Sequence, residues 1–453
     1  MHRSTPESAG SVLGNLVMAV FGAWHASNIP FVVLRNYEGL PLHIGHDVDV
    51  LLRKQDLERA ERLLVSAARA SGFHLSNRAE FSPISLFLFH PKSGVQTQFD
   101  LFHNLEWRSF PLLDARSVIN WRVQRGFFAS PHPVHEAVNN LLTRQMHHGY
   151  VKENYKEGIH AVFVEFPQVG ETVLRRLFGD ELGKKLAAGI LASDWDKVES
   201  LSRKMRSRLI IHRLRATPWL LLTNLWRDLR RYVKRFISPP GAKVILLGAD
   251  GSGKSSAAAQ LIEHLHGTFY RDKSIHRHWK PAVFLKERRA NRPPTTNPHG
   301  QPPRGWLTSQ LALAYHWMEF FVGSVVQYWP VLFRNGMVLV ERHHYDFIAD
   351  PRRYRLQPPS ALMRWAFRRL RTPDLVFLLD APAEVLHARK PEMSLEETAR
   401  RREAYLQLVK SLPQGRVVDA TQPLEAVVQG MVRETLHHLE SRQLKRTPAL
   451  AAK

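Results

Sequence analysis

The chain has 453 residues, a length typical of two or three domains. Its composition, 44% hydrophobic and 23% charged, is that of a globular protein, and the lack of cysteine excludes disulfides, thiolate metal sites and a cysteine nucleophile. A formal charge of +23 favours polyanionic partners such as nucleotides, nucleic acid, anionic lipid or phosphorylated glycans, although solvated arginine-rich helix faces would give the same excess. Met1–Gly10 is polar and has no apolar core of the signal-peptide type.

The first 130 residues alternate short apolar runs with amphipathic stretches, which predicts a small α/β domain with a mixed sheet. The expected elements are helices over Ser11–Ala26 and Gln55–Ala70, strands over Phe31–Leu34 and Val48–Leu52, and a hairpin of Ile84–His90 and Val95–Phe102 closed by the turn Pro91–Gly94.

Three carboxylates fall on these expected strands. Asp47 and Asp49 lie on one face of a strand, because strand side chains alternate, and the hairpin supplies Asp100. Neighbouring carboxylates repel one another, which makes sense beside a divalent cation, and three of them suit two-metal nucleotidyl transfer. We therefore predict a metal site here. The alternative is a strand with merely exposed acids.

The motif that carries these acids, Leu34–Tyr37 ahead of Gly45-x-Asp47-x-Asp49, resembles the nucleotidyltransferase superfamily that includes DNA polymerase beta. More narrowly, it is similar to nucleotidyltransferase-like proteins of bacteria, some of which are fused to thymidylate kinase-like domains and linked to surface-polysaccharide synthesis. The superfamily usually has a Gly-Gly or Gly-Ser turn before the paired acids, and Arg35 stands near that place here. The resemblance implies that Arg35 holds a phosphate or that the site is degenerate.

Helical periodicity dominates from Val134 to about Arg235, which predicts a helical domain over residues 131–237. Lys152 and Lys156 lie in a stretch expected to close over the acidic site, where they are phosphate candidates. The segment Arg215–Phe236 mixes leucine and tryptophan with arginine and lysine. It fits either an inter-domain helix or a helix lying on an anionic membrane surface.

A Pro-Pro-Gly boundary at residues 239–241 precedes the apolar strand Lys243–Leu247 and a G-x-x-x-x-G-K-[ST] loop, the P-loop signature. Its glycines let backbone N–H groups surround phosphate oxygens, Lys254 reaches the β- and γ-phosphates, and the Ser255 hydroxyl ligates Mg²⁺. The helix that follows offers its positive end to the phosphates. The expected ATP-binding residues are Gly248, Ala249, Asp250, Gly251, Ser252, Gly253, Lys254, Ser255 and Ser256.

Another buried strand is expected over Gly336–Val340, and it ends in Glu341 and Arg342. A carboxylate at a strand end can hold Mg²⁺ through water, and the arginine can clamp an acceptor phosphate bidentately. Between the P-loop and this strand, Trp306–Phe333 is long enough to span a membrane. Its internal polar residues favour a buried helix of an α/β domain instead.

A further strand, Asp374–Leu379, ends in Asp380 and is followed by the arginine-rich stretch Arg389–Arg402. This stretch is either a charged surface helix or a mobile lid whose cations, Arg389 and Arg400 among them, neutralise the transferring phosphoryl group. The last strand, Arg416–Ala420, is expected to end near the adenine.

Residues 243–440 resemble the thymidylate kinase family of P-loop nucleoside-monophosphate kinases, on the evidence of the Asp250-containing loop, Glu341-Arg342, Asp380 and the arginine-rich lid. The resemblance implies that Asp250 reads an acceptor hydroxyl and that Arg342 holds the acceptor phosphate. Glu341 stands where the family usually has Asp, and Gly251 where some members have a catalytic Arg, so the lid would supply that cation. Residues 276–303 depart from the family, which points to an acceptor other than thymidylate.

We therefore expect a nucleotidyltransferase-like α/β domain over residues 1–130, a helical domain and basic linker helix over 131–237, a P-loop kinase domain with a parallel sheet over 241–440, and a frayed tail over 441–453.

The predicted function is Mg²⁺-dependent phosphoryl transfer from ATP to a nucleotide or other phosphorylated acceptor. The alternatives are nucleotidyl transfer with the P-loop as an ATP sensor, and an ATP-switched protein that docks on membranes or an assembly. Nucleic acid is less favoured as a partner, and the formation of a homodimer is left open. The expected location is the cytoplasm, with the inner membrane face as a peripheral alternative. The 24 histidines form no convincing metal motif.

Overall fold

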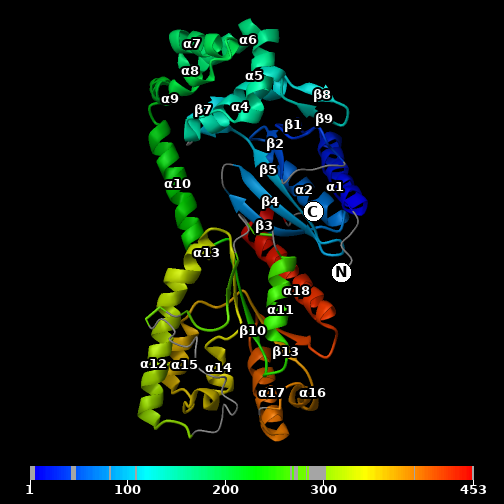
Figure 1. Cartoon of the computed structure of the whole chain (residues 1–453), viewed down its shortest axis with the longest axis vertical. Coiled ribbons are helices and arrows are strands. Elements are labelled where there is room, and N and C mark those ends of the chain that lie inside the picture. The colour runs from blue at the N-terminus through cyan, green and yellow to red at the C-terminus, as the bar shows by residue number, and fades with distance from the viewer. Residues whose placement is uncertain are drawn as a thin grey trace.

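The computed structural model is an elongated molecule in which two five-stranded sheets follow one another along the long axis, with a helical region at the far end of the first sheet (Figure 1). It describes residues 6–41, 47–80, 83–107, 110–265, 268–269, 274–281, 283–284, 302–391 and 393–450. Gly45 and most of the Pro293–Pro303 run therefore lie outside the described residues. Within these ranges, none of the helices is both long enough and apolar enough to cross a bilayer.

The first sheet is mixed and has the order β1-β2-β5-β4-β3, with β2 and β5 parallel and the other neighbours antiparallel. Alternate residues of its strands enter two cores: Val33 and Val50 pack with α1 and α2, whereas Val32 and Leu51 pack towards the helical region. Both faces are thus buried. The elements are α1 (Pro6–Ala26), β1 (Phe31–Val33), β2 (Asp47–Leu52), α2 (Leu57–Ala70), β3 (His74–Glu80), β4 (Ile84–His90) and β5 (Val95–Phe102).

The predicted hairpin and the helices and strands around it are confirmed, but β3 was not foreseen. Two small antiparallel ribbons and a short helix follow the sheet and lead into the helical region. They are β6 (Leu105–Trp107), β7 (Phe110–Leu113), α3 (Ala115–Asn120), β8 (Val123–Arg125) and β9 (Phe128–Ser130).

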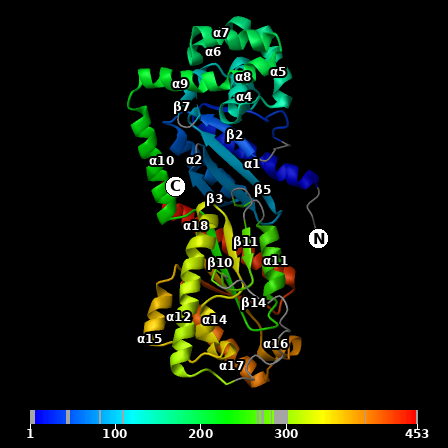
Figure 2. The same ribbon diagram turned by 60° about the vertical axis from the view of Figure 1, so that its left-hand side comes forward.

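The helical region matches the predicted helical stretch. Its core is a single cluster that α4, α6 and α7 share with the second face of the first sheet. The long helix α10 then runs from this region down to the second sheet (Figures 1 and 2). The helices are α4 (Pro133–His148), α5 (Glu153–Glu165), α6 (Pro167–Phe178), α7 (Asp180–Leu191), α8 (Trp195–Ser200), α9 (Ser202–Ala216) and α10 (Leu220–Ile237).

The second sheet is parallel throughout, with the order β11-β12-β10-β13-β14 and helices on both faces. Its central strands are almost entirely apolar, as expected for a sheet that is buried on both sides. Its strands and flanking helices are β10 (Ala242–Leu247), α11 (Lys254–His264), β11 (Ser274–Arg277), α12 (Trp306–Gly323), a π-helical turn (Ser324–Tyr328), α13 (Trp329–Phe333), β12 (Met337–Val340), α14 (Tyr345–Ala349), a 3₁₀ turn (Pro351–Tyr354), α15 (Ala361–Arg368), β13 (Leu375–Asp380), α16 (Ala383–Arg389), α17 (Leu395–Lys410), β14 (Gly415–Asp419) and α18 (Leu424–Arg446).

A buried polar joint connects the two sheets. Asn77 of β3 donates its amide to Asn335 Oδ1 at 2.6 Å, and Gln443 of α18 donates to Asn77 Oδ1 at 3.0 Å. Beside them, Glu440 of α18 accepts hydrogen bonds from Arg69 at 2.6 Å and His74 at 2.8 Å. Because Asn77, Asn335 and Gln443 are buried, the hydrogen bonds among them favour one arrangement of the two sheets.

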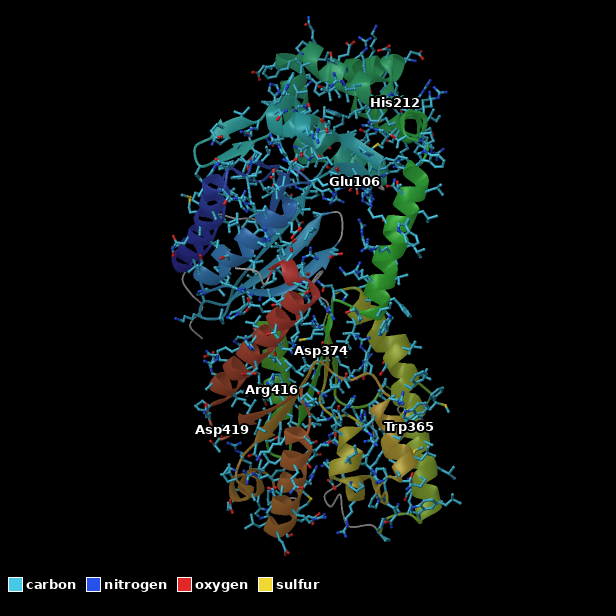
Figure 3. The ribbon with its side chains drawn as sticks, turned by 180° about the vertical axis from the view of Figure 1, so that it is seen from behind. Glu106, His212, Trp365, Asp374, Arg416 and Asp419 are labelled. Atoms are coloured by element: carbon cyan, nitrogen blue, oxygen red, sulfur yellow. The ribbon has the colours of Figure 1, made fainter. Side chains whose placement is uncertain are left out.

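Two sequence-based expectations are wrong. The predicted fraying after Arg442 does not occur, because α18 continues to Arg446 and Leu450 is buried in the core of the first sheet. Arg442 itself holds Asp374 at the edge of the second sheet, 2.8 Å away (Figure 3). Trp306–Phe333 is helical but not fully buried, since α12 packs through one face and leaves Trp306, Leu307 and other apolar residues exposed.

We predict that Asn77→Ala lowers the free energy of unfolding by about 2–5 kcal/mol, because it leaves the buried amides of Asn335 and Gln443 without their partner. The midpoint of urea unfolding measures this loss. Asn120→Ala, at an exposed position of α3, is the matched control. Equal unfolding midpoints for the two variants would show that the Asn77 joint does not contribute to stability.

Candidate functional site

The P-loop connects β10 to α11, as the sequence predicted. Gly251 and Gly253 have φ values of +84° and +83°, which side chains rarely adopt. A Cβ on Gly248 would lie 2.8 Å from the carbonyl oxygen of Leu379 in β13, so the loop packs directly on the sheet. Lys254 opens α11 and donates to the carbonyl oxygens of Gly248 and Ala249 at 2.9 and 2.8 Å. Burial lowers the pKa of Lys254 to about 8.

Glu341 follows β12 directly and faces the start of α11. Because β10 and β12 are parallel neighbours, their carboxyl ends meet at the same edge of the sheet. Ser255 donates its hydroxyl to Glu341 Oε2 at 2.7 Å, so the two expected magnesium ligands are adjacent. Oxygen ligands of this kind fit Mg²⁺, which usually binds through one or two protein groups together with substrate phosphates.

Two histidines also contact Glu341. His276 Nε2 lies 2.7 Å from Oε1, and His278 Nδ1 lies 2.9 Å from Oε2. Both come from β11 and the residue that follows it, in a segment that the sequence linked only to acceptor specificity. The structure places them instead around the buried carboxylate that was expected to hold the metal.

Three arginines converge on Asp250 in the P-loop. Arg353 is ion-paired with Oδ2, Arg401 lies 3.0 Å from the same oxygen, and Arg342 lies 3.5 Å from Oδ1. Burial alone would raise the pKa of Asp250, but the charges of Arg353 and Arg401 outweigh it and hold the pKa well below its usual range. We expected Asp250 to read an acceptor hydroxyl, whereas here both of its oxygens are engaged by arginines.

The second anchor of this cluster is Asp350, whose carboxylate lies 2.8 Å from Arg401. Arg401 is only 3% exposed at its side chain, so its guanidinium is one of the interior charges of the protein. Arginine presents five N–H donors in a fixed fork that matches phosphate and carboxylate groups. The cluster of Arg342, Arg353 and Arg401 therefore has the chemistry of an anion-binding site next to the P-loop.

The arginine-rich stretch contributes differently from what we expected. Arg400 points away from the site and pairs with Glu397 on the surface of α17. Arg389 lies close to the P-loop, since a Cβ on Gly251 would meet its Cβ at 3.4 Å, and it donates to the carbonyl oxygen of Ala420 at 3.0 Å. The structure thus brings Arg401 and Arg353 to the site, which the sequence did not single out, and Arg400 does not reach it.

An aromatic wall lies beside the arginine cluster. The rings of Trp279 and Tyr354 stack at 5.9 Å with 15° between their planes, and Lys280 lies 5.0 Å from the Trp279 centroid. Lys280 also forms an ion pair with Glu319, which α12 buries completely. Stacked rings next to cations can bind a planar or ring-shaped anionic ligand.

The three predicted carboxylates of the first sheet do meet. Asp49 of β2 and Asp100 of β5 are register partners, and together with Asp47 they can offer oxygens that all lie within 4.8 Å of one another. Burial and the charges of Asp49 and Asp47 raise the pKa of Asp100 to about 6. Asp49 Oδ1 is buried without a hydrogen-bond partner among the described residues, as a metal ligand would be. The donor set therefore fits a divalent cation.

Two of these acids, Asp49 and Asp100, line a cavity of about 280 Å³ between the first sheet and α4. Arg35 is ion-paired with Asp49 there, so this candidate phosphate contact lies in the site. Lys152 and Lys156 do not line this cavity, and Lys156 is held by Glu153 at 2.8 Å. His147, the first residue of the stretch that was expected to close over this site, does line the cavity. The rest of the wall from α4, including Asn139 and Thr143, was not identified from the sequence.

Comparison with protein-family models and with curated proteins gives no match. Among solved structures, a crystal structure of thymidylate kinase from Ehrlichia chaffeensis matches 43% of this chain and 98% of that chain, with 17% sequence identity and a TM-score of 0.31. A likeness this distant carries no argument about the present chain. The coordinates themselves show an α/β protein in which a P-loop sequence sits on a parallel five-stranded sheet.

We predict that the full chain binds Mn²⁺ at the acidic site and that Asp49→Asn weakens this binding at least about tenfold, because it removes a charged oxygen ligand. Electron paramagnetic resonance of free Mn²⁺, recorded without nucleotide, measures the affinity. Asp196→Asn, an exposed carboxylate on α8, is the control and should leave binding unchanged. Equal affinity in the wild type and both variants would show that the three carboxylates hold no metal.

Proposed function

We propose that this protein is an ATP-dependent phosphotransferase whose acceptor carries a phosphate or a comparable anionic group. The observation that supports this most directly is the junction of the P-loop with the arginine cluster. Asp250 belongs to the phosphate-binding loop, and Arg342, Arg353 and Arg401 converge on it. A donor phosphate in the loop and an acceptor phosphate held by these arginines would then lie next to each other.

On the donor side, the loop amides and Lys254 would bind the β- and γ-phosphates of ATP. Ser255 and Glu341 would hold Mg²⁺, whose role when bound is to neutralise charge on those phosphates. His276 and His278 keep the Glu341 carboxylate oriented towards Ser255 by contacting both of its oxygens. These side chains position the donor.

On the acceptor side, Arg342 and Arg353 would bind the acceptor's anionic group, and Arg401 would stabilise the charge that spreads over the transferring phosphoryl oxygens. Phosphoryl transfer needs little covalent help from the protein and depends on positioning and electrostatics. Asp250 keeps the three guanidinium groups together. The stacked Trp279 and Tyr354 favour an acceptor with a flat or cyclic part, such as a nucleotide or a sugar phosphate.

We predict that Lys254→Met reduces ATP turnover at least about 100-fold, because it removes the cation that contacts the β- and γ-phosphates. The assay measures ATP consumption across a panel of nucleotides and sugar phosphates. Lys410→Met, an exposed lysine at the end of α17, is the matched control. Unchanged ATP turnover in Lys254→Met would contradict the proposed phosphotransferase function.

The arginine pair on α17 gives a second test within one helix. Arg401→Gln is expected to lower kcat/KM for the acceptor about 100-fold or more, whereas the exposed Arg400→Gln leaves it nearly unchanged. Arg401→Lys keeps a positive charge next to Asp250 and Asp350 but removes the forked set of N–H donors. It therefore distinguishes the loss of bidentate binding from the loss of folding. Equal effects at positions 400 and 401 would contradict the acceptor site.

A second candidate function is nucleotidyl transfer at Asp47, Asp49 and Asp100. It is favoured by the convergence of these acids, two of which, Asp49 and Asp100, line together with Arg35 a cavity large enough for part of a nucleotide. In that reaction the chain would release pyrophosphate from a nucleoside triphosphate. Pyrophosphate release that is lost in Asp49→Asn but kept in Lys254→Met would assign nucleotidyl transfer to the acidic site of the first sheet.

A further inference from the structure

Helix α10 exposes the side that an amphipathic helix normally buries. Leu222, Leu225, Leu229, Tyr232 and Phe236 recur at helical spacing and form one apolar stripe. All five are at least 50% exposed. The stripe is widened by further exposed apolar side chains, namely Trp219, Trp226, Val233 and Ile237.

Two of the cations of α10 hold the helix to the first sheet. Arg227 pairs with Glu106 of β6 at 3.3 Å, and Lys234 pairs with Glu80 of β3 at 2.8 Å. Glu106 lies beside α10 in Figure 3. The upper part of the apolar stripe is therefore left exposed while these ion pairs fix the helix.

The apolar surface continues along the second sheet. At the lower end of α10, Tyr232 stacks on Phe333 at 6.2 Å and Phe236 contacts Trp329 at 5.1 Å, so α10 joins α13 directly. Figures 1 and 2 show α10, α13 and α12 following one another along one edge of the molecule. Exposed apolar residues on α12 and the π-helical turn extend the stripe: Trp306, Leu307, Leu311, Met318, Phe321, Val325 and Val326.

Helix α15 packs beside α12 through the hydrogen bond from Trp317 to the carbonyl oxygen of Ala366, 2.9 Å long. It adds the exposed Leu362 and Trp365, and Trp365 is marked on this side of the molecule in Figure 3. We call the exposed apolar residues of α10, the π-helical turn, α12 and α15 the apolar edge.

Charge identifies the kind of partner. Residues 202–237, which form α9 and α10, contain eleven lysines and arginines and one acidic residue, Asp228, so this segment carries a formal charge of +10. Two copies of the chain that met at this edge would bring these positive charges close together, and the charges would repel each other. An anionic bilayer attracts them and also accepts the leucine, tryptophan and tyrosine side chains at its interface.

We propose that the apolar edge docks on the surface of an anionic lipid bilayer, with the apolar residues in the headgroup–acyl boundary and the basic residues of α9 and α10 among the headgroups. This inference is independent of the reaction that the protein catalyses. Because the buried Glu319 of α12 pairs with Lys280, which lies beside the aromatic wall, docking also places the proposed acceptor site close to the membrane surface.

Flotation of the full chain with phosphatidylcholine vesicles, with and without phosphatidylglycerol, tests the proposal. The wild type should float only with phosphatidylglycerol present and should lose binding at high salt. Arg230→Gln, at an exposed position of α10, should weaken partitioning about fivefold, which corresponds to one basic residue near an anionic surface. The double variant Trp226→Glu with Leu229→Glu should abolish flotation.

The matched control is Trp121→Glu, which changes a similarly exposed tryptophan after α3 that lies beside His132 and His135 at the start of α4. It should float like the wild type, and circular dichroism confirms that all variants are folded. No flotation of the wild type on anionic vesicles would overturn the proposal. So would a concentration-dependent dimer that Trp226→Glu dissociates in sedimentation while vesicle binding is absent, since the edge would then be an interface between two copies.

Discussion

The neutralisation of Asp250 is the interaction on which the proposed kinase site depends. Removing a carboxylate or a guanidinium group from water costs several kcal/mol, and only close pairing with hydrogen bonds offsets this. Asp250 meets this condition with arginines from three separate parts of the chain, namely the end of β12, the 3₁₀ turn and α17. The P-loop therefore holds together segments that are otherwise linked only through the sheet, and it gathers cations where two phosphates would meet.

Much of this site could be predicted from the sequence because the signals are local. The P-loop needs only a strand, glycines and a helix start, and Glu341 needs only a buried strand that ends in a carboxylate. Whether Arg400 or Arg401 reaches the site depends instead on how α17 is rotated about its axis. This rotation is fixed by the buried side chains of Thr398, Tyr405 and Val409. Arg401 lies three residues after Thr398 and four before Tyr405. That spacing is a signal in the sequence that could have identified it.

Strand β3 and the exposed face of α12 were missed for a different reason. His74–Glu80 contains Ser76, Asn77 and Arg78, which obscure the alternation of a strand, yet Ser76 and Asn77 are completely buried. Their hydrogen bonds are made with Phe87, Asn335 and Gln443, two of which are more than 250 residues away in the chain. Composition cannot show such partners, and it equally cannot show whether an apolar helix faces a core or an external surface.

The joint between the two sheets also determines how the two candidate sites relate. Arg442 of α18 donates to the carbonyl oxygens of Pro240 and Gly241, just before β10, so the first sheet is attached at the amino end of the second sheet. The P-loop lies at the carboxyl end, and the six residues of β10 between them span about 20 Å. The acidic cavity lies farther away still, between the first sheet and α4. A small ligand therefore does not span the two sites. Coupling between them would run through the protein, either through α18 and the Asn77 joint or through α10, which pairs with Glu106 of the cavity wall and contacts α13.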